Sequence, residues 1–110
     1  MKPLASRAML ELRPNCELCD RDLPPDSPDA RVCSYECTFC ASCVDEVLHD
    51  VCPNCGGNFQ PRPIRPERAW RDGTGLVNDP PGDRRRHTPY TREQLEQFSA
   101  GLRDVPPAER

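Results

Sequence analysis

Eight cysteines between Cys16 and Cys55 constrain this chain more than any other feature of its sequence. They form four pairs with two or three residues between the members: Cys16 and Cys19, Cys33 and Cys37, Cys40 and Cys43, Cys52 and Cys55. Such a pair can bring two thiolates to one tetrahedral ion, and four thiolates complete a zinc site without leaving a position for water. The sequence therefore predicts two closed, structural Zn²⁺ sites. An iron–sulfur cluster and a thiol redox protein are the alternatives that the same residues permit.

An even number of cysteines also permits disulfides, so the compartment has to be considered. The opening stretch, MKPLASRAMLELR, has no apolar run of the length found in secretory signals, and charges interrupt it at Lys2, Arg7, Glu11 and Arg13. No segment approaches the length of an apolar membrane span. We therefore expect a cytoplasmic protein without a membrane anchor, in which the paired cysteines bind metal.

The assignment of the cysteines to two sites follows from a predicted helix. Val44, Val47, Leu48 and Val51 recur at helical spacing, which predicts a helix over about residues 41–50 that opens on the third cysteine pair. Its amide terminus would then face the thiolates and offset part of their charge. A turn with the first pair, a short β-hairpin and this helix make a treble-clef arrangement. The predicted sites are Cys16, Cys19, Cys40 and Cys43 for the first ion and, by elimination, Cys33, Cys37, Cys52 and Cys55 for the second.

The composition leaves little else to hold the fold together. The chain has 110 residues, of which 35% are hydrophobic and 5% aromatic, so only a small core can be buried. Metal binding must supply the missing stability. The expected fold class is a small metal-stabilised α+β domain with one hairpin and one helix, followed by a mostly disordered tail.

Proline and glycine mark the boundaries along the chain. Residues 1–8 form a leader or a misassigned start, residues 9–64 the two-zinc domain, and residues 65–87 a Pro/Gly/Arg-rich linker that we expect to be disordered. The tail at residues 88–110 contains a predicted helix from Thr91 to about Leu102, with Gln94 placed to complete a capping box. Leu95, Phe98 and Leu102 share one face of this helix and are candidate partner-binding residues.

The charge distribution argues against nucleic acid as a partner. The formal net charge is −3, and residues 1–64 contain six Lys or Arg against ten Asp or Glu. Thiolates around two zinc ions would make this half still more acidic. Phosphate recognition requires a basic surface, so we expect neither DNA nor RNA to bind here.

The ligand order resembles the RING finger family, in which two sites interleave along the chain. The resemblance covers Cys16 to Cys55 and extends to Cys-Pro-Asn-Cys at the last pair and to an apolar residue, Leu18, after the first ligand. It implies a partner-binding patch that includes Leu18 and Pro53, whereas Val47 is expected in the core. RING ligases often carry Arg directly after the eighth ligand, where this chain has Gly56. A sequential, LIM-type pairing is ranked second because its second loop is normally longer than the one between Cys43 and Cys52.

The local sequence is closer to a bacterial group of uncharacterised Cys-rich proteins, the domain of unknown function 1272 family. The similar stretches are MLELRPNCELCDRDLPPDSPDARVCSYECTFCASC, which begins at Met9, and CPNCGG, which begins at Cys52. This resemblance implies a zinc-binding domain and brings no known activity with it.

No arrangement of catalytic side chains stands out, so we expect a binding module and not an enzyme. The predicted function is a protein interaction or adaptor module with structural zinc, monomeric, with an unidentified protein partner. Three alternatives remain: a zinc-ribbon-like regulator that contacts nucleic acid, a RING-type ubiquitin-like ligase, and a redox or zinc-buffering protein.

Overall fold

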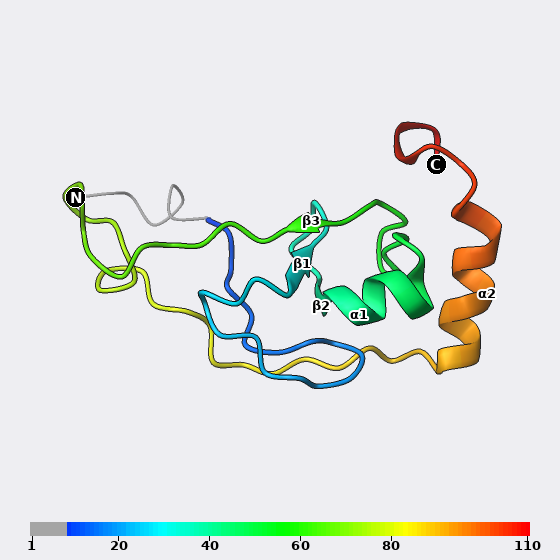
Figure 1. The fold of residues 1–110 in the computed structure, drawn as a ribbon, viewed down its shortest axis with the longest axis horizontal. Coiled ribbons are helices and arrows are strands. Elements are labelled where there is room, and N and C mark those ends of the chain that lie inside the picture. The colour runs from blue at the N-terminus through cyan, green and yellow to red at the C-terminus, as the bar shows by residue number, and fades with distance from the viewer. Residues whose placement is uncertain (1–8) are drawn as a thin grey trace.

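The computed structural model describes residues 9–110, so the expectation for the leader at residues 1–8 lies outside the described residues. Its regular elements are short and are separated by turns (Figure 1). In chain order they are β1 (Ala30–Val32), β2 (Thr38–Cys40), α1 (Ala41–Cys43), η2 (Val44–Leu48), β3 (Gln60–Pro61), α2 (Arg92–Leu102) and η3 (Pro107–Glu109).

The three strands form one small antiparallel sheet in the order β2-β1-β3. β1 and β2 make the predicted hairpin, with Ala30 opposite Cys40 and Val32 opposite Thr38. The tight connection between them includes Glu36 in a left-handed conformation, with a φ of 69°. β3 pairs with the other edge of β1, where Arg31 lies opposite Pro61. The sheet is too small to be stable alone and serves to hold the cysteine loops in register.

The predicted helix over residues 41–50 is confirmed in place and is two residues shorter than expected. Cys40 is the N-cap of α1, which continues directly into the wider π-helical turn η2. The helix ends at Leu48 because His49 and Asp50 both take left-handed conformations, with φ values of 49° and 63°. Its first turn therefore presents backbone amides at the third cysteine pair, as the sequence predicted.

The apolar core lies between the hairpin and the α1–η2 helix. Phe39 and Phe59 meet edge to face, with ring centroids 5.5 Å apart and an interplanar angle of 79°. Val47 and Leu48 project into the same cluster and are buried, so the expectation that Val47 belongs to the core is confirmed. Six of the eight cysteines also belong to this cluster: Cys16, Cys33, Cys37, Cys40, Cys43 and Cys52. The core is thus largely built around the cysteine side chains.

The segment at residues 65–87 differs from the disordered linker that the sequence predicted. It contains no helix or strand, but its first part is a compact loop closed by a hydrogen bond from Leu76 N to Pro66 O (2.8 Å). Its second part lies along the first cysteine loop, where Gly82 N donates to Leu12 O (2.9 Å) (Figure 1). The sequence suggested disorder because the segment is rich in Pro and Gly and has little apolar periodicity; hydrogen bonds to the domain fix it instead.

The predicted C-terminal helix is confirmed as α2. Thr91 caps it, and the capping box with Gln94 is complete: Gln94 N donates to Thr91 Oγ1 (3.2 Å) and Thr91 N donates to Gln94 Oε1 (2.9 Å). α2 packs against η2 and lies at one end of the molecule (Figure 1). Leu95 enters the core cluster from this helix and is only 1% exposed. The helix is therefore part of the folded unit and not a separate tail.

Candidate metal centre

The first cysteine cluster contains the four predicted residues Cys16, Cys19, Cys40 and Cys43. Their sulfurs all lie within 4.8 Å of one another, and Cys19 Sγ is 3.8 Å from Cys40 Sγ. Two of the sulfurs come from the first loop and two from the start of α1, so the cluster joins the loop to the helix.

The loop that carries Cys16 and Cys19 is shaped to direct both sulfurs to one point. Cys19 N lies 3.5 Å from Cys16 Sγ, and Asp20 N donates to Cys16 O (2.9 Å). Asp20 has a left-handed backbone, with a φ of 65°, which an aspartate tolerates better than most residues. With two residues between the cysteines, the chain turns around the Cys16 sulfur, and the Cys19 sulfur lies in the same cluster.

The second cluster consists of Cys33, Cys37 and Cys52, whose sulfurs also lie within 4.8 Å of one another. Cys55 was predicted as the fourth ligand, but its sulfur is not within this distance of all three, and the residue is exposed. It lies in the same turn as Cys52, in which Gly56 N donates to Cys52 O (2.7 Å). The Cys55 sulfur accepts a hydrogen bond from Gly57 N (3.4 Å). The structure thus brings three of the four predicted ligands together, whereas Cys55 lies in the exposed turn at the rim of this cluster, and its role as the fourth ligand stays a prediction.

The two clusters interleave along the chain, because the first and third cysteine pairs share one cluster and members of the second and fourth pairs share the other. A sequential pairing would have placed Cys33 and Cys37 with Cys16 and Cys19, and the structure excludes it. Helix α1, which brings Cys40 and Cys43 to the first loop, is the element that decides between the two pairings.

Close packing of thiols changes their acidity. A hydrogen bond to the Cys43 sulfur lowers the pKa of Cys16 to about 4, and the same contact raises the pKa of Cys43. In the second cluster, the hydrogen bond between Cys33 and Cys37 lowers the pKa of Cys37 to about 2 and raises the pKa of Cys33 to about 11, and separate hydrogen bonds to Cys33 and Cys37 raise the pKa of Cys52. Each cluster therefore favours a thiolate next to protonated neighbours. A cation that displaces the remaining protons would bind all of the sulfurs as anions.

The donor set fits Zn²⁺ or a similarly soft cation. The two clusters contain cysteine alone, with no His or carboxylate among their members. Sulfur-only sites select zinc, copper(I) or iron–sulfur clusters over harder ions such as Mg²⁺ and Ca²⁺. The four residues of the first cluster would complete a tetrahedral zinc site, and the second would do so once Cys55 turns inward.

Two buried charged side chains beside the clusters were not foreseen from the sequence. Glu17, between the first two ligands, is only 5% exposed. Its carboxylate accepts hydrogen bonds from Thr38 N (2.7 Å) and from Arg13 Nη1 (3.0 Å), which ties the first loop to β2. Arg62, also 5% exposed, donates to Arg13 O (2.8 Å) and Leu23 O (3.1 Å). Burial lowers the pKa of Arg62. No spacing rule in the sequence would have identified either residue.

The five candidate partner-binding residues have different positions in the structure. Leu95 is buried in the core cluster, so this side chain packs on the chain's own domain. Leu18 is partly buried against the core, and Leu102 is half-buried, with its Cδ1 close to Gly56. Pro53 is buried but lines a small pocket next to Phe98, which remains 43% exposed. Three of the five candidates thus belong to α2, which packs against the domain beside Pro53.

In the part of the chain that the structure describes, no helix is both long and apolar enough to cross a membrane.

Comparison with known proteins identifies the family of this chain. The family model described as protein of unknown function (DUF1272) matches residues 9–65, which contain all eight cysteines. A protein from Rhizobium meliloti (strain 1021), named uncharacterized protein R02474, is 66% identical over 77 residues, which cover 67% of this chain and 92% of the relative. No solved structure matches the chain significantly. With the family model matching half of the sequence and this relative matched over nearly its whole length, the chain belongs to the DUF1272 family.

Proposed function

We propose that this protein is a structural zinc protein that acts as an interaction module, with two Zn²⁺ ions that hold a RING-like, cross-braced domain together. The observation that carries the proposal is the pair of interleaved, sulfur-only clusters. Interleaving ties the two ends of the Cys-rich segment to each other, so the metals replace the apolar core that the composition cannot supply.

We also propose that the protein is not an enzyme. Four thiolates around an ion leave no position for a water or a substrate, which catalytic zinc sites require. The charged groups next to the first cluster, buried Glu17 and half-buried Arg13, are paired with each other, and Glu17 also accepts a hydrogen bond from Thr38 N. They are therefore suited to fixing the loops and not to transferring protons.

A role in protein interaction is supported by what surrounds the metal loops. The domain places Pro53, Phe98 and Tyr90 around one pocket, and the last two side chains are 43% and 44% exposed. Exposed aromatic side chains on ordered elements are typical of protein interfaces. The acidic character of the metal domain disfavours nucleic acid as the partner.

Native mass spectrometry of the purified full chain tests the metal assignment, combined with cobalt substitution. Two bound ions per chain, and cobalt spectra typical of tetrahedral sulfur coordination, are expected. Disulfides in place of metal, or a colour and iron content typical of an iron–sulfur cluster, would refute the proposal. The interaction role is tested by the same spectra of protein from its own host, in which a stoichiometric second chain is expected.

A second function, zinc exchange or buffering, is favoured by one specific observation. Cys55 is exposed and lies outside the converged group of Cys33, Cys37 and Cys52. A ligand at the rim gives a chelator or an acceptor protein access to the metal. Rapid transfer of one of the two ions to an apo acceptor, at a rate that depends on acceptor concentration, would support this function over a purely structural role.

A further inference from the structure

The turn from Cys52 to Gly57, which we call the last cysteine turn, is closed by its own backbone. Gly56 N donates to Cys52 O (2.7 Å), and Cys52 N donates to Gly57 O (2.8 Å). Gly56 has a φ of 79°, a conformation that glycine adopts without steric cost. Within the predicted second site, Cys55 is exposed and the other three cysteines are buried. Cys55 is therefore the predicted ligand of this site that solvent reaches first.

One arginine of the C-terminal segment bonds to the backbone on both sides of the last two predicted ligands. Arg110 Nη1 donates to Asp50 O (3.0 Å), ahead of the last cysteine turn, and to Gly56 O (3.1 Å), directly after the fourth ligand. Arg110 Nε donates to Val105 O (3.0 Å) in the C-terminal segment itself. The guanidinium thus ties the C-terminal segment to the last cysteine turn through charge-assisted hydrogen bonds, which are stronger than those between neutral groups.

An apolar contact adds to these hydrogen bonds. Leu102, the last residue of α2, is half-buried, and its Cδ1 lies 3.5 Å from the position that a Cβ on Gly56 would take. Gly56 is buried, although Cys55 before it is exposed. The contacts of Leu102 and Arg110 with the last cysteine turn are called the C-terminal clasp below.

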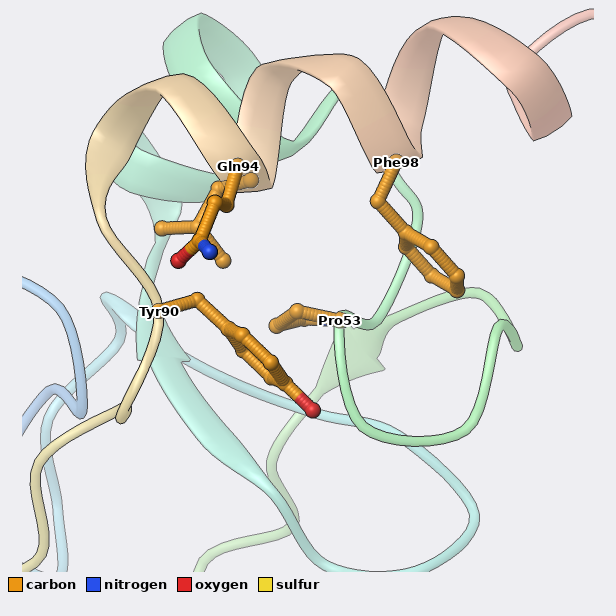
Figure 2. A pocket seen from close by; sticks show the side chains of 5 residues that line it. Pro53, Tyr90, Gln94 and Phe98 are labelled. Carbon is orange, nitrogen blue, oxygen red and sulfur yellow. The ribbon is translucent and has the colours of Figure 1, made fainter.

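Beside the clasp, the last cysteine turn meets α2 less closely. Pro53 lies next to a pocket of about 230 Å³ that Tyr90 and Phe98 also line (Figure 2). Among the described residues, no hydrogen bond joins residues 52–55 themselves to the C-terminal segment; the polar links are at Leu48, Asp50 and Gly56. The clasp is therefore what restrains the turn on the side of the exposed ligand.

We propose that the C-terminal clasp controls how fast metal leaves the second site, because it holds the last cysteine turn where Cys55 can complete that site. The proposal rests on the two metal sites proposed above and names the chain's own C-terminal segment as the element that regulates one of them. Loss of metal from a thiolate site requires local opening, which begins at the least protected ligand. The closed clasp limits this opening, and an open clasp lets the turn move away and gives a chelator access.

The test follows metal loss from the full, metal-loaded chain in excess EDTA by native mass spectrometry, with N-ethylmaleimide alkylation to identify the cysteines that are freed. Arg110→Ala should accelerate loss of the second-site ion at least about threefold, the effect of one typical hydrogen bond. Alkylation should then reach Cys55 and its cluster before the first cluster. Arg103→Ala is the matched control, because it removes the same charge from an exposed position of the same segment; it should behave like wild type. Without EDTA, every variant should keep both ions.

Two further variants separate positioning of Cys55 from general stability. Arg110→Lys should lose the second ion more slowly than Arg110→Ala, because one nitrogen of Arg110 makes both bonds to the domain and an ammonium group can donate to the same carbonyls. In a Cys55→Ser chain, Arg110→Ala should have little further effect, because the ligand that the clasp holds is then absent.

Wild-type rates of metal loss for Arg110→Ala would overturn the proposal. Equal acceleration for both ions, or an undiminished effect of Arg110→Ala in the Cys55→Ser chain, would overturn it as well, since either result means that the arginine acts on overall stability. All of these outcomes leave the two metal sites standing. Absence of metal from the wild-type chain would instead refute the proposed function, so the two failures are distinguishable.

Discussion

The metal domain at residues 9–65 and the C-terminal segment at residues 82–110 are both ordered, but different interactions hold them. The domain is organised around two sulfur clusters, and six of its cysteines form part of its core. The C-terminal segment contributes one fully buried leucine, Leu95, and otherwise depends on hydrogen bonds such as those between Asn15 and Arg86.

This difference implies an order of dependence. The C-terminal segment needs the domain, because Leu95 and Ser99 of α2 have their partners there. Nothing in the cysteine clusters requires α2, since all the clustered sulfurs come from residues before 53. Damage to the metal sites should therefore destroy both regions, whereas damage to the C-terminal contacts should leave the metal sites intact.

Metal removal is the change with the largest expected effect. A structural zinc site contributes apparent binding energy of order 10 kcal/mol, which is more than the whole stability of most small domains. A chelator together with a reductant should therefore unfold residues 9–65 and release α2 with them. Loss of dispersion in a two-dimensional NMR spectrum measures the unfolding, and added Zn²⁺ should restore it. A dispersed spectrum without metal would show that the apolar core suffices.

Single cysteine substitutions should separate the two clusters. Cys16→Ser removes a fully buried ligand from the converged first cluster, so we expect loss of one ion and unfolding. Cys55→Ser changes an exposed residue at the rim of the second cluster, so both ions should remain and one should transfer faster to a competing chelator. Native mass spectra taken during chelator competition measure both effects. Cys19→Ser is the control, because Cys19 is exposed yet converged; identical behaviour of all three variants would contradict the distinction.

Leu95→Ala should release α2 without loss of metal. Replacing a buried leucine by alanine typically costs about 2–5 kcal/mol, and here the cost falls on the docking of one helix. Hydrogen exchange should become faster at the α2 amides while exchange in β1 and β2 stays slow. Gln97→Ala, a change at an exposed site on the same helix, should leave the exchange rates of α2 and of β1 and β2 unchanged. Faster exchange throughout the domain would mean that α2 is required for the metal fold.

The sequence predicted the cysteine clusters and the helix beside them well because their determinants are local. Cysteines two residues apart bring two sulfurs together in one turn, and the apolar spacing of Val44, Val47 and Leu48 placed the helix. That helix then decided which pairs share a cluster. The capping box at Thr91 and Gln94 was predictable for the same reason, since its two partners lie within one turn.

The packing of the C-terminal segment could not be predicted in this way. Arg86 bonds to Asn15 across 71 positions of sequence, and no periodicity connects them. The apolar face of α2 was visible, but whether it meets its own domain or a partner depends on tertiary geometry. The position of Cys55 could not be predicted either. Its spacing from Cys52 indicates that its sulfur can reach the same ion, but not that the sulfur lies beside those of Cys33, Cys37 and Cys52.

Asn15→Ala should weaken the attachment of the C-terminal segment. The buried side chain donates to Arg86 O (2.8 Å) and accepts from Arg86 N (3.2 Å), so its loss leaves two backbone groups without these partners. Because Arg86 is exposed, water replaces part of the lost bonding, so the expected cost is about 1 kcal/mol, the net value of a typical hydrogen bond. Hydrogen exchange should accelerate at the amides of residues 82–88. Asn78→Ala, at an exposed site, should not have this effect.

Arg85→Ala should have the smallest effect, although Arg85 makes more polar contacts than its neighbours. Its guanidinium lies 2.7 Å from Asp22 Oδ1 and 2.9 Å from Asp20 Oδ1, and these contacts raise the pKa of Arg85. All three side chains are exposed, so water and salt screen the attraction and the side chains lose entropy when they pair. The midpoint of chemical unfolding and the metal content should therefore match wild type. If Arg85→Ala instead destabilised the protein as much as Asn15→Ala, as measured by the unfolding midpoints of both variants, the surface charges and not the buried Asn15 amide would attach the C-terminal segment to the domain.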